Sequence, residues 1–481
     1  MPSLHDLTAL EQAAAIRRRE ISPTDLTDHY LGRIGAHNDK VGAFITVTAD
    51  RARAQAAEAE RRVMGASGTD VLPPLLGVPV PIKDLNRVDG VRCTFGSTVY
   101  ADWIADSDDH VVSLLRAAGT VMLGKTNTPE FGCPCYTENR VAPPARTPWD
   151  LSRSAGGSSG GAGAAVAAGL APAAHGSDGG GSVRIPASAC GLVGLKVSRG
   201  RISNGPLGGD VSGLSWSGPI ARTVRDAAAL LDAMAIPMPG DPHWAPPLPP
   251  GDSFSAAAER DPGRLRIGRF ITPAAVETEV HPDCEAAYED ASRLLAGLGH
   301  EVEDVEPPFT AGAVPFFERV WAVMAGLAPV PPGAEEQLMP LTRWLREQAE
   351  SVSGHAYAEA IAVMQAASRI AIAGLATYDA LLTPTLALPP APVGSIRDDA
   401  DPARDFHNQK AFTPFTAVYN VTGQPAINLP LSWNQDGLPI GVMLAGRPAG
   451  EAQLISLAAQ MEAACPTWTV AGPQARRPAL W

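Results

Sequence analysis

Apolar and polar positions alternate along the chain with two different periods, one typical of helices and one typical of short strands. Residues 1–65 are predicted to be helical, because Ser22, Pro23 and Asp25 form a helix start and "TADRARAQAAEAERRV" is rich in alanine and charge. From Leu75 onwards, apolar runs such as "LLGVPVPIK" and "TVMLGKTN" alternate with amphipathic stretches such as "DDHVVSLLRAAG". This alternation predicts an α/β core.

The same alternation continues through the second half of the chain. "RLRIGRF" and "HEVEDV" are predicted strands around the helix "PDCEAAYEDASRLLAGLG", and residues 311–376 are predicted to be mostly helical. "YDALLTPTLALPP" is a further strand, "QPAINLPLSWNQDGLPIGVMLAG" is a hairpin turning at Asp436 and Gly437, and "EAQLISLAAQMEAA" is the last helix. We expect a single large α/β domain over residues 1–481, with a central mixed twisted β-sheet covered by helices.

The charge and the apolar runs argue against several classes of partner. The formal net charge is −13, whereas nucleic acids and anionic membrane surfaces attract clustered lysine and arginine. No apolar run reaches the roughly 20 residues that span a bilayer, and the N-terminus carries no signal-peptide core. The sequence therefore predicts a cytoplasmic protein, monomer or homodimer, with no nucleic-acid and no membrane partner.

Cysteines and glycine loops give no sign of a bound group. The six cysteines are too scattered for a disulfide scaffold. Cys133 and Cys135 form a lone C-x-C pair, which lacks the four-ligand spacing of a zinc site. Ala162 follows Gly161 where a Walker loop needs lysine, so no phosphate loop is present. The sequence predicts neither a metal nor an organic cofactor.

The glycine-rich stretch "AGGSSGGAGAAVAAG" at 155–169 has three interpretations. Such tracts are often flexible linkers, but here an apolar, alanine-rich helix follows. The stretch also matches the G-x-S-x-G elbow of an α/β-hydrolase-type esterase, with Ser159 as nucleophile, although the preceding "PWDLSRSA" is polar. In the third interpretation it is a catalytic turn that works with a second glycine loop, "GSDGGGSVRIP" at 176–186.

Several motifs taken together favour the third interpretation. "GVPVPIKD", "GKTNTPEFG", "GGSSGG", "SDGGGSVRIPAS" and "NVTGQPAINLPLS" follow one another in this order, and from about residue 4 to 464 the chain resembles the amidase signature family of serine hydrolases. Segments 179–219 and 311–345 are similar to nylon-oligomer cyclic-dimer hydrolases and broad-specificity amidases of that family. The resemblance implies N-terminal helices over 1–65, an amidase-signature core over 66–235, and a variable helical segment over 311–376 that covers the substrate.

The resemblance also implies a catalytic triad. Ser182 is the expected nucleophile, Lys83 the expected base, and Ser158 the bridge between them, placed by a cis peptide bond after Gly157. These residue types suit the chemistry, because a serine hydroxyl needs a base and a lysine accepts a proton only when burial keeps it neutral. The expected oxyanion hole consists of the backbone N–H groups of Gly179, Gly180, Gly181 and Ser182.

Four polar residues near the triad are given supporting roles. Asp178 and Arg184 stand on either side of the expected nucleophile Ser182 and its preceding glycines, and they are expected to hold this loop in shape. His175 is expected to be a structural histidine at a strand end whose ring nitrogens have hydrogen-bond partners. Asp84 is a candidate for orienting the neighbouring Lys83. A catalytically silent scaffold with the same fold stays an alternative to the enzyme.

The expected reaction is hydrolysis of C–N bonds in small apolar or aryl amides through an acyl-enzyme. Carbamates (urethanes) are a further substrate class, with a carbamoyl-enzyme as intermediate, and the expected partner is thus a small-molecule amide or carbamate. Ile185 stands where the glutamine-using branch typically has Gln, so no role in tRNA amidation is expected. The residues expected to bind the substrate are Cys133, Cys135, Thr137, Phe316 and Trp321.

Overall fold

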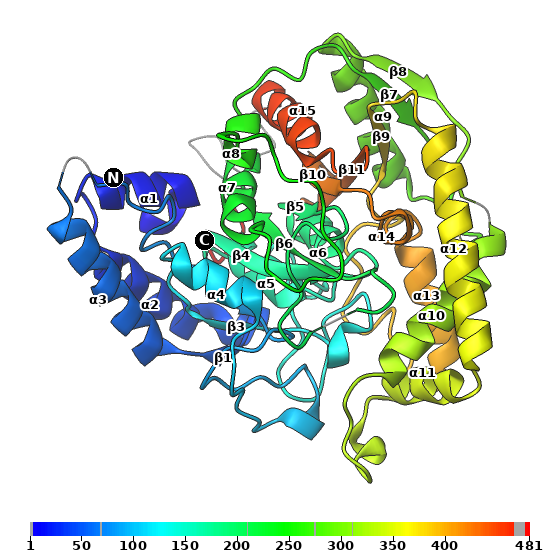
Figure 1. The fold of residues 1–481 in the computed structure, drawn as a ribbon, viewed down its shortest axis with the longest axis horizontal. Helices are drawn as coiled ribbons and strands as arrows, with labels where there is room; N and C mark the ends of the chain where they lie inside the picture. The colour runs from blue at the N-terminus through cyan, green and yellow to red at the C-terminus, as the bar shows by residue number, and fades with distance from the viewer. Residues whose placement is uncertain (1–2, 68–69, 209, 274–275, 310, 466–476) are drawn as a thin grey trace.

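The strands of the chain form two sheets. A computed structural model describes residues 3–67, 70–208, 210–273, 276–309, 311–465 and 477–481. Its strands are β1 (Phe44–Val47), β2 (Ile82–Lys83), β3 (Gly124–Thr126), β4 (Ala173–Asp178), β5 (Val193–Lys196), β6 (Trp216–Ala221), β7 (Arg266–Arg269), β8 (Glu301–Asp304), β9 (Ala380–Pro384), β10 (Ala426–Trp433) and β11 (Pro439–Gly446). Eight of them form one sheet in the order β4-β6-β5-β10-β11-β9-β7-β8, and three form a small sheet in the order β1-β3-β2 (Figure 1).

Helices surround both sheets. They are α1 (Ala9–Arg17), α2 (Pro23–Val41), α3 (Ala49–Gly65), α4 (His110–Ala117), α5 (Gly160–Ala167), α6 (Arg184–Cys190), α7 (Val224–Met234), α8 (Phe254–Ala257), α9 (Pro282–Gly297), α10 (Val314–Gly326), α11 (Pro340–Glu350), α12 (Gly354–Gly374), α13 (Pro402–Phe412), α14 (Val418–Thr422) and α15 (Glu451–Ala464). Among the described residues, no helix is both long enough and apolar enough to cross a membrane.

The large sheet is mixed and carries the core of the molecule. Neighbouring strands from β4 to β9 pair antiparallel, whereas β7 pairs in parallel with both β9 and β8. The largest apolar cluster joins this sheet to α7, α9 and α15, and a second cluster joins α5 and α6 to the N-terminal helices. The predicted α/β fold with a central mixed sheet is confirmed, and so is the hairpin of β10 and β11.

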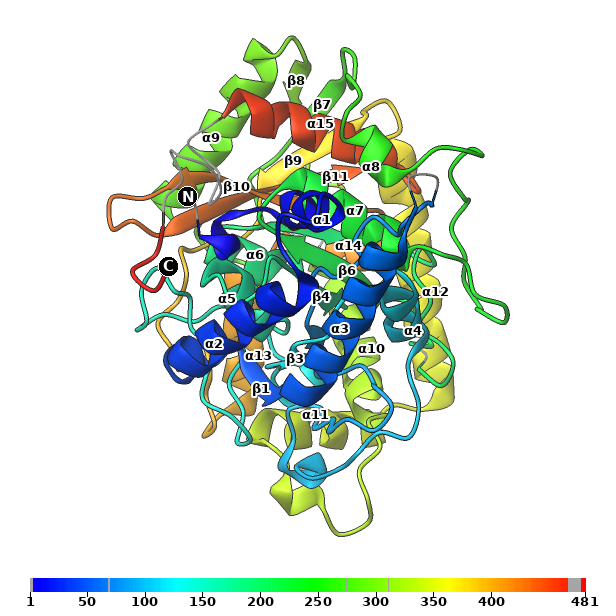
Figure 2. The ribbon, with the colours of Figure 1, turned by 90° about the vertical axis from the view of Figure 1, so that its left-hand side faces the viewer.

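The first 65 residues are helical, with one strand among them that the sequence analysis did not anticipate. The predicted helix start is present: the Ser22 hydroxyl accepts a hydrogen bond from the Asp25 amide at 2.9 Å, and Pro23 opens α2. Strand β1 lies between α2 and α3 and pairs antiparallel with β3. Figure 2 shows α2 and α3 side by side over the small sheet.

The strand that ends in Lys83 is shorter than its apolar pattern suggests. It comprises only Ile82 and Lys83, and it pairs in parallel with β3 in the small sheet instead of joining the central one. Pro79 and Pro81 explain this, because proline has no N–H to contribute to a strand ladder. The lysine nevertheless lies beside β4 of the large sheet, because β2 packs against that strand.

The glycine-rich stretch is a buried turn followed by a buried helix. Every residue of α5 is buried, and a side chain at Gly161 would collide with the backbone of Ala43 and Asn127. The linker interpretation is therefore wrong. The esterase elbow is also wrong, because only isolated bridges at Arg153 and Ser154 precede the turn where an elbow needs a strand.

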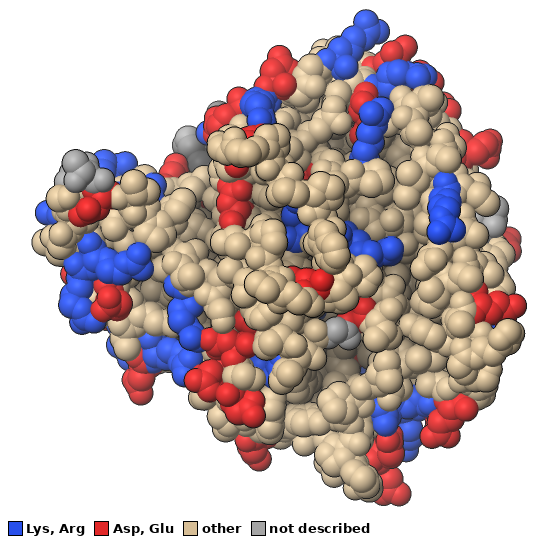
Figure 3. All heavy atoms as spheres, viewed as in Figure 1, with Lys and Arg blue, Asp and Glu red and all other residues tan. Residues whose placement is uncertain are grey.

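Charged side chains are dispersed over the face shown in Figure 3. Lysines and arginines lie among aspartates and glutamates, and charged side chains of both signs are also visible in the middle of this face. Residues 311–376, predicted to be mostly helical, contain α10, α11 and α12, which stand at the right of Figure 1. Side chains of α10 and α12 line the pocket described below.

Candidate active site

Lys83 is completely buried, and among the described residues its ammonium nitrogen forms hydrogen bonds only with serines. The Lys83 Nζ atom donates hydrogen bonds to Ser158 Oγ at 2.8 Å and to Ser177 Oγ at 3.0 Å, and it lies 3.3 Å from the Ser177 carbonyl oxygen. Burial lowers the pKa of Lys83 to about 7, although the Asp178 carboxylate acts in the opposite direction. A large fraction of this lysine is thus neutral near neutral pH, as a general base must be.

Ser158 lies in a turn that neighbouring residues hold tightly. The peptide bond between Gly157 and Ser158 is cis, as expected. A side chain at Gly157 would come within 2.7 Å of the Tyr136 backbone. The Thr137 hydroxyl donates to the Gly156 carbonyl at 2.9 Å and accepts from the Gly160 amide at 3.1 Å, so it ties the two ends of the turn together.

Ser182 follows β4 and stands at the wall of a pocket. Its side chain is 7 % exposed, and its carbonyl accepts a hydrogen bond from the Ser159 amide at 3.2 Å. Within the described ranges, no hydrogen bond joins the Ser182 hydroxyl to Ser158. The structure therefore forms the contact between the expected base and the expected bridge, and leaves the expected nucleophile open toward the pocket.

The loop from Asp178 to Ser182, which we call the nucleophile loop, is held through its backbone. Asn420 Nδ2 donates to the Asp178 carbonyl at 2.9 Å, and the Gly181 amide donates to Asp178 Oδ1 at 2.8 Å. The Gly181 amide is therefore already paired, which corrects its expected place in the oxyanion hole. The amides of Gly179, Gly180 and Ser182 have no acceptor in the part of the chain described by the structure.

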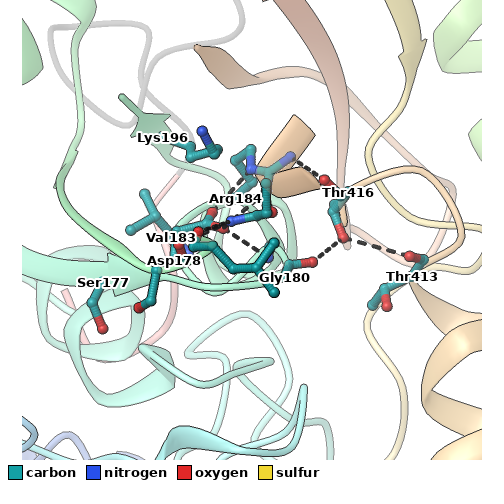
Figure 4. Close-up of polar contacts among 12 residues, drawn as sticks. Ser177, Asp178, Gly180, Val183, Arg184, Lys196, Thr413 and Thr416 are labelled. Carbon is teal, nitrogen blue, oxygen red and sulfur yellow. Dashed lines mark hydrogen bonds and ion pairs between the residues drawn. The ribbon is translucent and has the colours of Figure 1, made fainter. Parts of the chain in front are cut away.

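A buried ion pair anchors the nucleophile loop. Asp178 and Arg184 are both fully buried and approach to 2.9 Å (Figure 4). Burial raises the pKa of the Asp178 carboxyl, but the Arg184 guanidinium outweighs burial and holds that pKa below its ordinary value. Arg184 also donates to the Thr416 carbonyl at 2.8 Å and to Asn420 Oδ1 at 2.7 Å. Asp178 and Arg184 thus shape the loop, in keeping with their expected role.

Two further polar residues, Asp84 and His175, lie near Lys83 and are paired with other side chains. Asp84 pairs with Lys125 at 2.7 Å, and it makes no contact with the Lys83 ammonium among the described hydrogen bonds and ion pairs, so the idea that it orients Lys83 is wrong. His175 lies inside β4, where its Nε2 atom is 3.0 Å from Ser217 Oγ. Burial lowers the pKa of His175 to about 3, so this histidine is neutral.

Ser177 is a contact of the lysine that the sequence analysis missed. It lies on the strand directly before Asp178 and accepts a hydrogen bond from Lys83. Its backbone exchanges two hydrogen bonds with the Ser159 hydroxyl, at 3.1 and 3.2 Å. The Ser159 hydroxyl is thus already paired as both donor and acceptor, which argues against it as a nucleophile. Its position could have indicated this contact, because Ser177 directly precedes the nucleophile loop near the end of an apolar strand.

The pocket beside Ser182 is mainly apolar. Of the five residues expected to bind substrate, Cys133, Cys135 and Trp321 line it. Phe317, which stacks on Trp321 with ring centroids 5.5 Å apart, lines the pocket in place of Phe316.

Thr137 and Phe316 lie outside the pocket. The hydroxyl of Thr137 is hydrogen-bonded to Gly156 and Gly160 in the turn around Ser158, and the ring of Phe316 packs against the Arg319 guanidinium. Phe406 and Val418 also line the pocket and were missed, since the sequence analysis assigned no helix over 402–422. Among the described residues, no group of three or more His, Cys, Asp or Glu side chains could hold a metal ion.

Comparisons with known proteins identify the family of this chain. The Amidase family model matches residues 25–455. The 6-aminohexanoate-cyclic-dimer hydrolase of Paenarthrobacter ureafaciens is 37% identical over 98% of this chain and 97% of its own length, and the acylamidase of Rhodococcus erythropolis is 35% identical over 96% of each. A solved structure of 6-aminohexanoate cyclic dimer hydrolase with substrate superposes with a TM-score of 0.89, at 34% identity and 99% coverage of both chains. The chain therefore belongs to the amidase family of amidase-signature enzymes, which hydrolyse amides.

Proposed function

We propose that this amidase hydrolyses C–N bonds of small apolar or aryl amides with Ser182 as nucleophile, Ser158 as proton bridge and Lys83 as base. The observation that carries the proposal is the hydrogen bond of 2.8 Å from a fully buried lysine to Ser158, next to a serine that faces an apolar pocket. The partial neutrality of Lys83 supplies the base that a serine hydroxyl lacks on its own.

In the first half-reaction an acyl-enzyme forms. Ser182 Oγ attacks the substrate carbonyl carbon as its proton passes to Ser158, whose own proton passes to Lys83 Nζ. The carbonyl oxygen becomes an oxyanion, which the free loop amides stabilise. The C–N bond then breaks, and the proton returns from Lys83 through Ser158 to the departing amine. In the second half-reaction, water attacks the acyl group by the same relay and releases Ser182.

The pocket supports an apolar acyl or aryl group. Its apolar wall includes Trp321, Phe317 and Val418. Burial of an apolar group against these side chains is favourable because it removes apolar surface from water. The same relay serves carbamates, because a urethane carbonyl accepts the same attack. The carbamoyl-enzyme is less electrophilic than an acyl-enzyme, so we expect slower turnover on an aryl carbamate than on the matched aryl amide.

The test combines mutation with capture of the intermediate. In buffer containing EDTA, we expect Ser182→Ala to abolish hydrolysis of an aryl amide, and Ser158→Ala and Lys83→Ala each to lose about 10³-fold or more in kcat. Ser159→Ala is the matched control, because this serine lies in the same turn without touching Lys83. Mass spectrometry of the quenched wild type is expected to find the acyl group on Ser182.

Three results would contradict this proposal. An active Ser182→Ala enzyme would exclude the nucleophile, and an inactive wild type on every amide and carbamate offered would favour a silent scaffold. Free glutamine as the best substrate would exclude the preference for apolar amides.

A further inference from the structure

One peptide unit of the nucleophile loop is held at both of its ends. The Thr416 hydroxyl donates a hydrogen bond to the Gly180 carbonyl at 2.6 Å, and the Gly181 amide donates to Asp178 Oδ1 at 2.8 Å. Figure 4 shows the Thr416 hydroxyl between the carbonyls of Gly180 and Thr413, the second of which lies farther away, at 3.4 Å. Because the C=O and N–H of a trans peptide point in opposite directions, these two bonds fix the plane of the peptide from Gly180 to Gly181.

This peptide has little of its own to hold it in place. Both flanking residues are glycines, which have the largest backbone freedom of all residues. Gly181 has φ +137°, a conformation that side chains disfavour, and a side chain there would collide with Thr416. If the peptide flipped, the Gly180 carbonyl would turn away from Thr416. Since Gly180 and Ser182 both line the pocket, a flip brings a partial negative charge close to the reacting carbonyl.

We propose that Thr416 is a positioning residue for the oxyanion hole. Its hydroxyl holds the Gly180 carbonyl away from the substrate and thereby keeps the loop amides directed at the reacting carbonyl oxygen. This inference rests on the proposed function, because it assigns the developing charge to the nucleophile loop. Thr416 comes from the segment between α13 and α14, which lies 236 residues further along the chain than Gly180. Its neighbours Pro414 and Ala417 line the pocket, so the substrate wall and the oxyanion loop share one support.

The side chain of Thr416 can be tested separately from its backbone. The Thr416 carbonyl accepts the hydrogen bond from Arg184 at 2.8 Å, and a side-chain substitution leaves that carbonyl in place. Thr416→Val keeps the size and removes the hydroxyl, whereas Thr416→Ser keeps the hydroxyl and removes only a methyl group. Thr422→Val is the matched control, because Thr422 lies in the neighbouring α14 and, among the described contacts, does not touch the nucleophile loop.

The experiment measures kcat, KM and inhibition on an aryl amide. We expect Thr416→Val to lower kcat by about 10- to 100-fold with KM within about twofold, since only the transition state carries the oxyanion. An aryl trifluoromethyl ketone, which forms a tetrahedral oxyanion on a serine, should lose inhibition by a similar factor. The corresponding secondary alcohol, which forms none, should inhibit the variant and the wild type equally. Thr416→Ser should restore wild-type behaviour, and Thr422→Val should leave it unchanged.

Several outcomes would overturn the positioning role. One is a Thr416→Val enzyme with wild-type kcat, and another is equal weakening of the ketone and the alcohol, which indicates general damage to the pocket. If Thr416→Val does not fold, Thr416→Ala takes its place in the comparison with Thr416→Ser, and equal activity of these two excludes the hydroxyl. Failure of the proposed function is seen separately, because it leaves Ser182→Ala active whatever residue occupies position 416.

Discussion

At the scale of single residues, the proposed function depends on a lysine that its surroundings make partly neutral near pH 7. Burial lowers the pKa of Lys83 to about 7, against the opposing effect of Asp178. Below that pH the ammonium already holds its proton and cannot accept another. We therefore expect kcat/KM to rise with pH through about 7 and to level off above it, because the free enzyme gains a neutral base. The measurement is a pH profile on an amide that has no titratable group of its own.

A profile of the opposite shape would remove the lysine as base. A rate that is constant at low pH and falls above about pH 7 would require a protonated group in the working enzyme. The control is the melting temperature over the same pH range, which shows that the loss of rate at low pH is not unfolding.

The motifs predicted the contact between Lys83 and Ser158, and they did not predict how the nearby backbone is turned. Lys83 and Ser158 are 75 positions apart and form a hydrogen bond, as the joint motif implied. The Gly181 amide was expected to face the substrate and instead donates to Asp178. The direction of a peptide plane depends on partners such as Thr416, which is far away in sequence, so a local motif contains no information about it.

At the scale of elements, a buried ion pair joins the segment after β2 to β3. Lys125 and Asp84 are both fully buried and lie 2.7 Å apart. Removing one partner leaves the other charge buried and unpaired, so we expect Lys125→Met to lower the free energy of unfolding by about 3–5 kcal/mol. The measurement is a urea unfolding curve at pH 7.

The double variant Lys125→Met with Asp84→Asn provides the control for this expectation. It removes both charges, and we expect it to recover most of the lost stability, with a coupling energy of about 0.5–3 kcal/mol or more in the cycle. Additive losses would show that the two side chains do not act as a pair in the folded protein.

Element boundaries were harder to predict than element types. The apolar run before Lys83 indicated a strand of the central sheet, but its prolines reduce β2 to two residues in a separate sheet. The segment 311–376 was correctly expected to contain helices. Within it, Phe317 lines the pocket and Phe316 does not, because adjacent residues point about 100° apart around a helix of 3.6 residues per turn. Without a known helix start, the sequence could not fix that phase.

At the scale of the whole molecule, the pocket is assembled from parts that are distant in sequence. The loop with Cys133, the nucleophile loop, α10 and the segment around α13 and α14 all contribute to its wall. The sequence could predict the fold class because the order of strands and helices is a local signal, repeated many times. It could not predict which aromatic side chains line the pocket, because that depends on how α10, α11 and α13 pack on one another.

Two tryptophans of the helical segment provide a test of this assembly. Trp321 lines the pocket. Its ring lies 3.6 Å from the position that a Cβ atom would take at Gly179 or Gly180, which is ordinary van der Waals contact. Trp344 lies on α11 and packs against Phe406 in a tilted arrangement, with ring centroids 5.9 Å apart. It is not among the described residues that line the pocket. We expect Trp321→Ala to raise KM for an aryl amide by about 5-fold or more while affecting KM for acetamide little, because it removes apolar contact with the bound ring.

Trp344→Ala is the control. It should leave KM within about twofold and lower the melting temperature, since it removes packing between helices. The reverse pattern, with KM raised only by Trp344→Ala, would mean that the aryl group binds against α11 and not against the wall formed by α10.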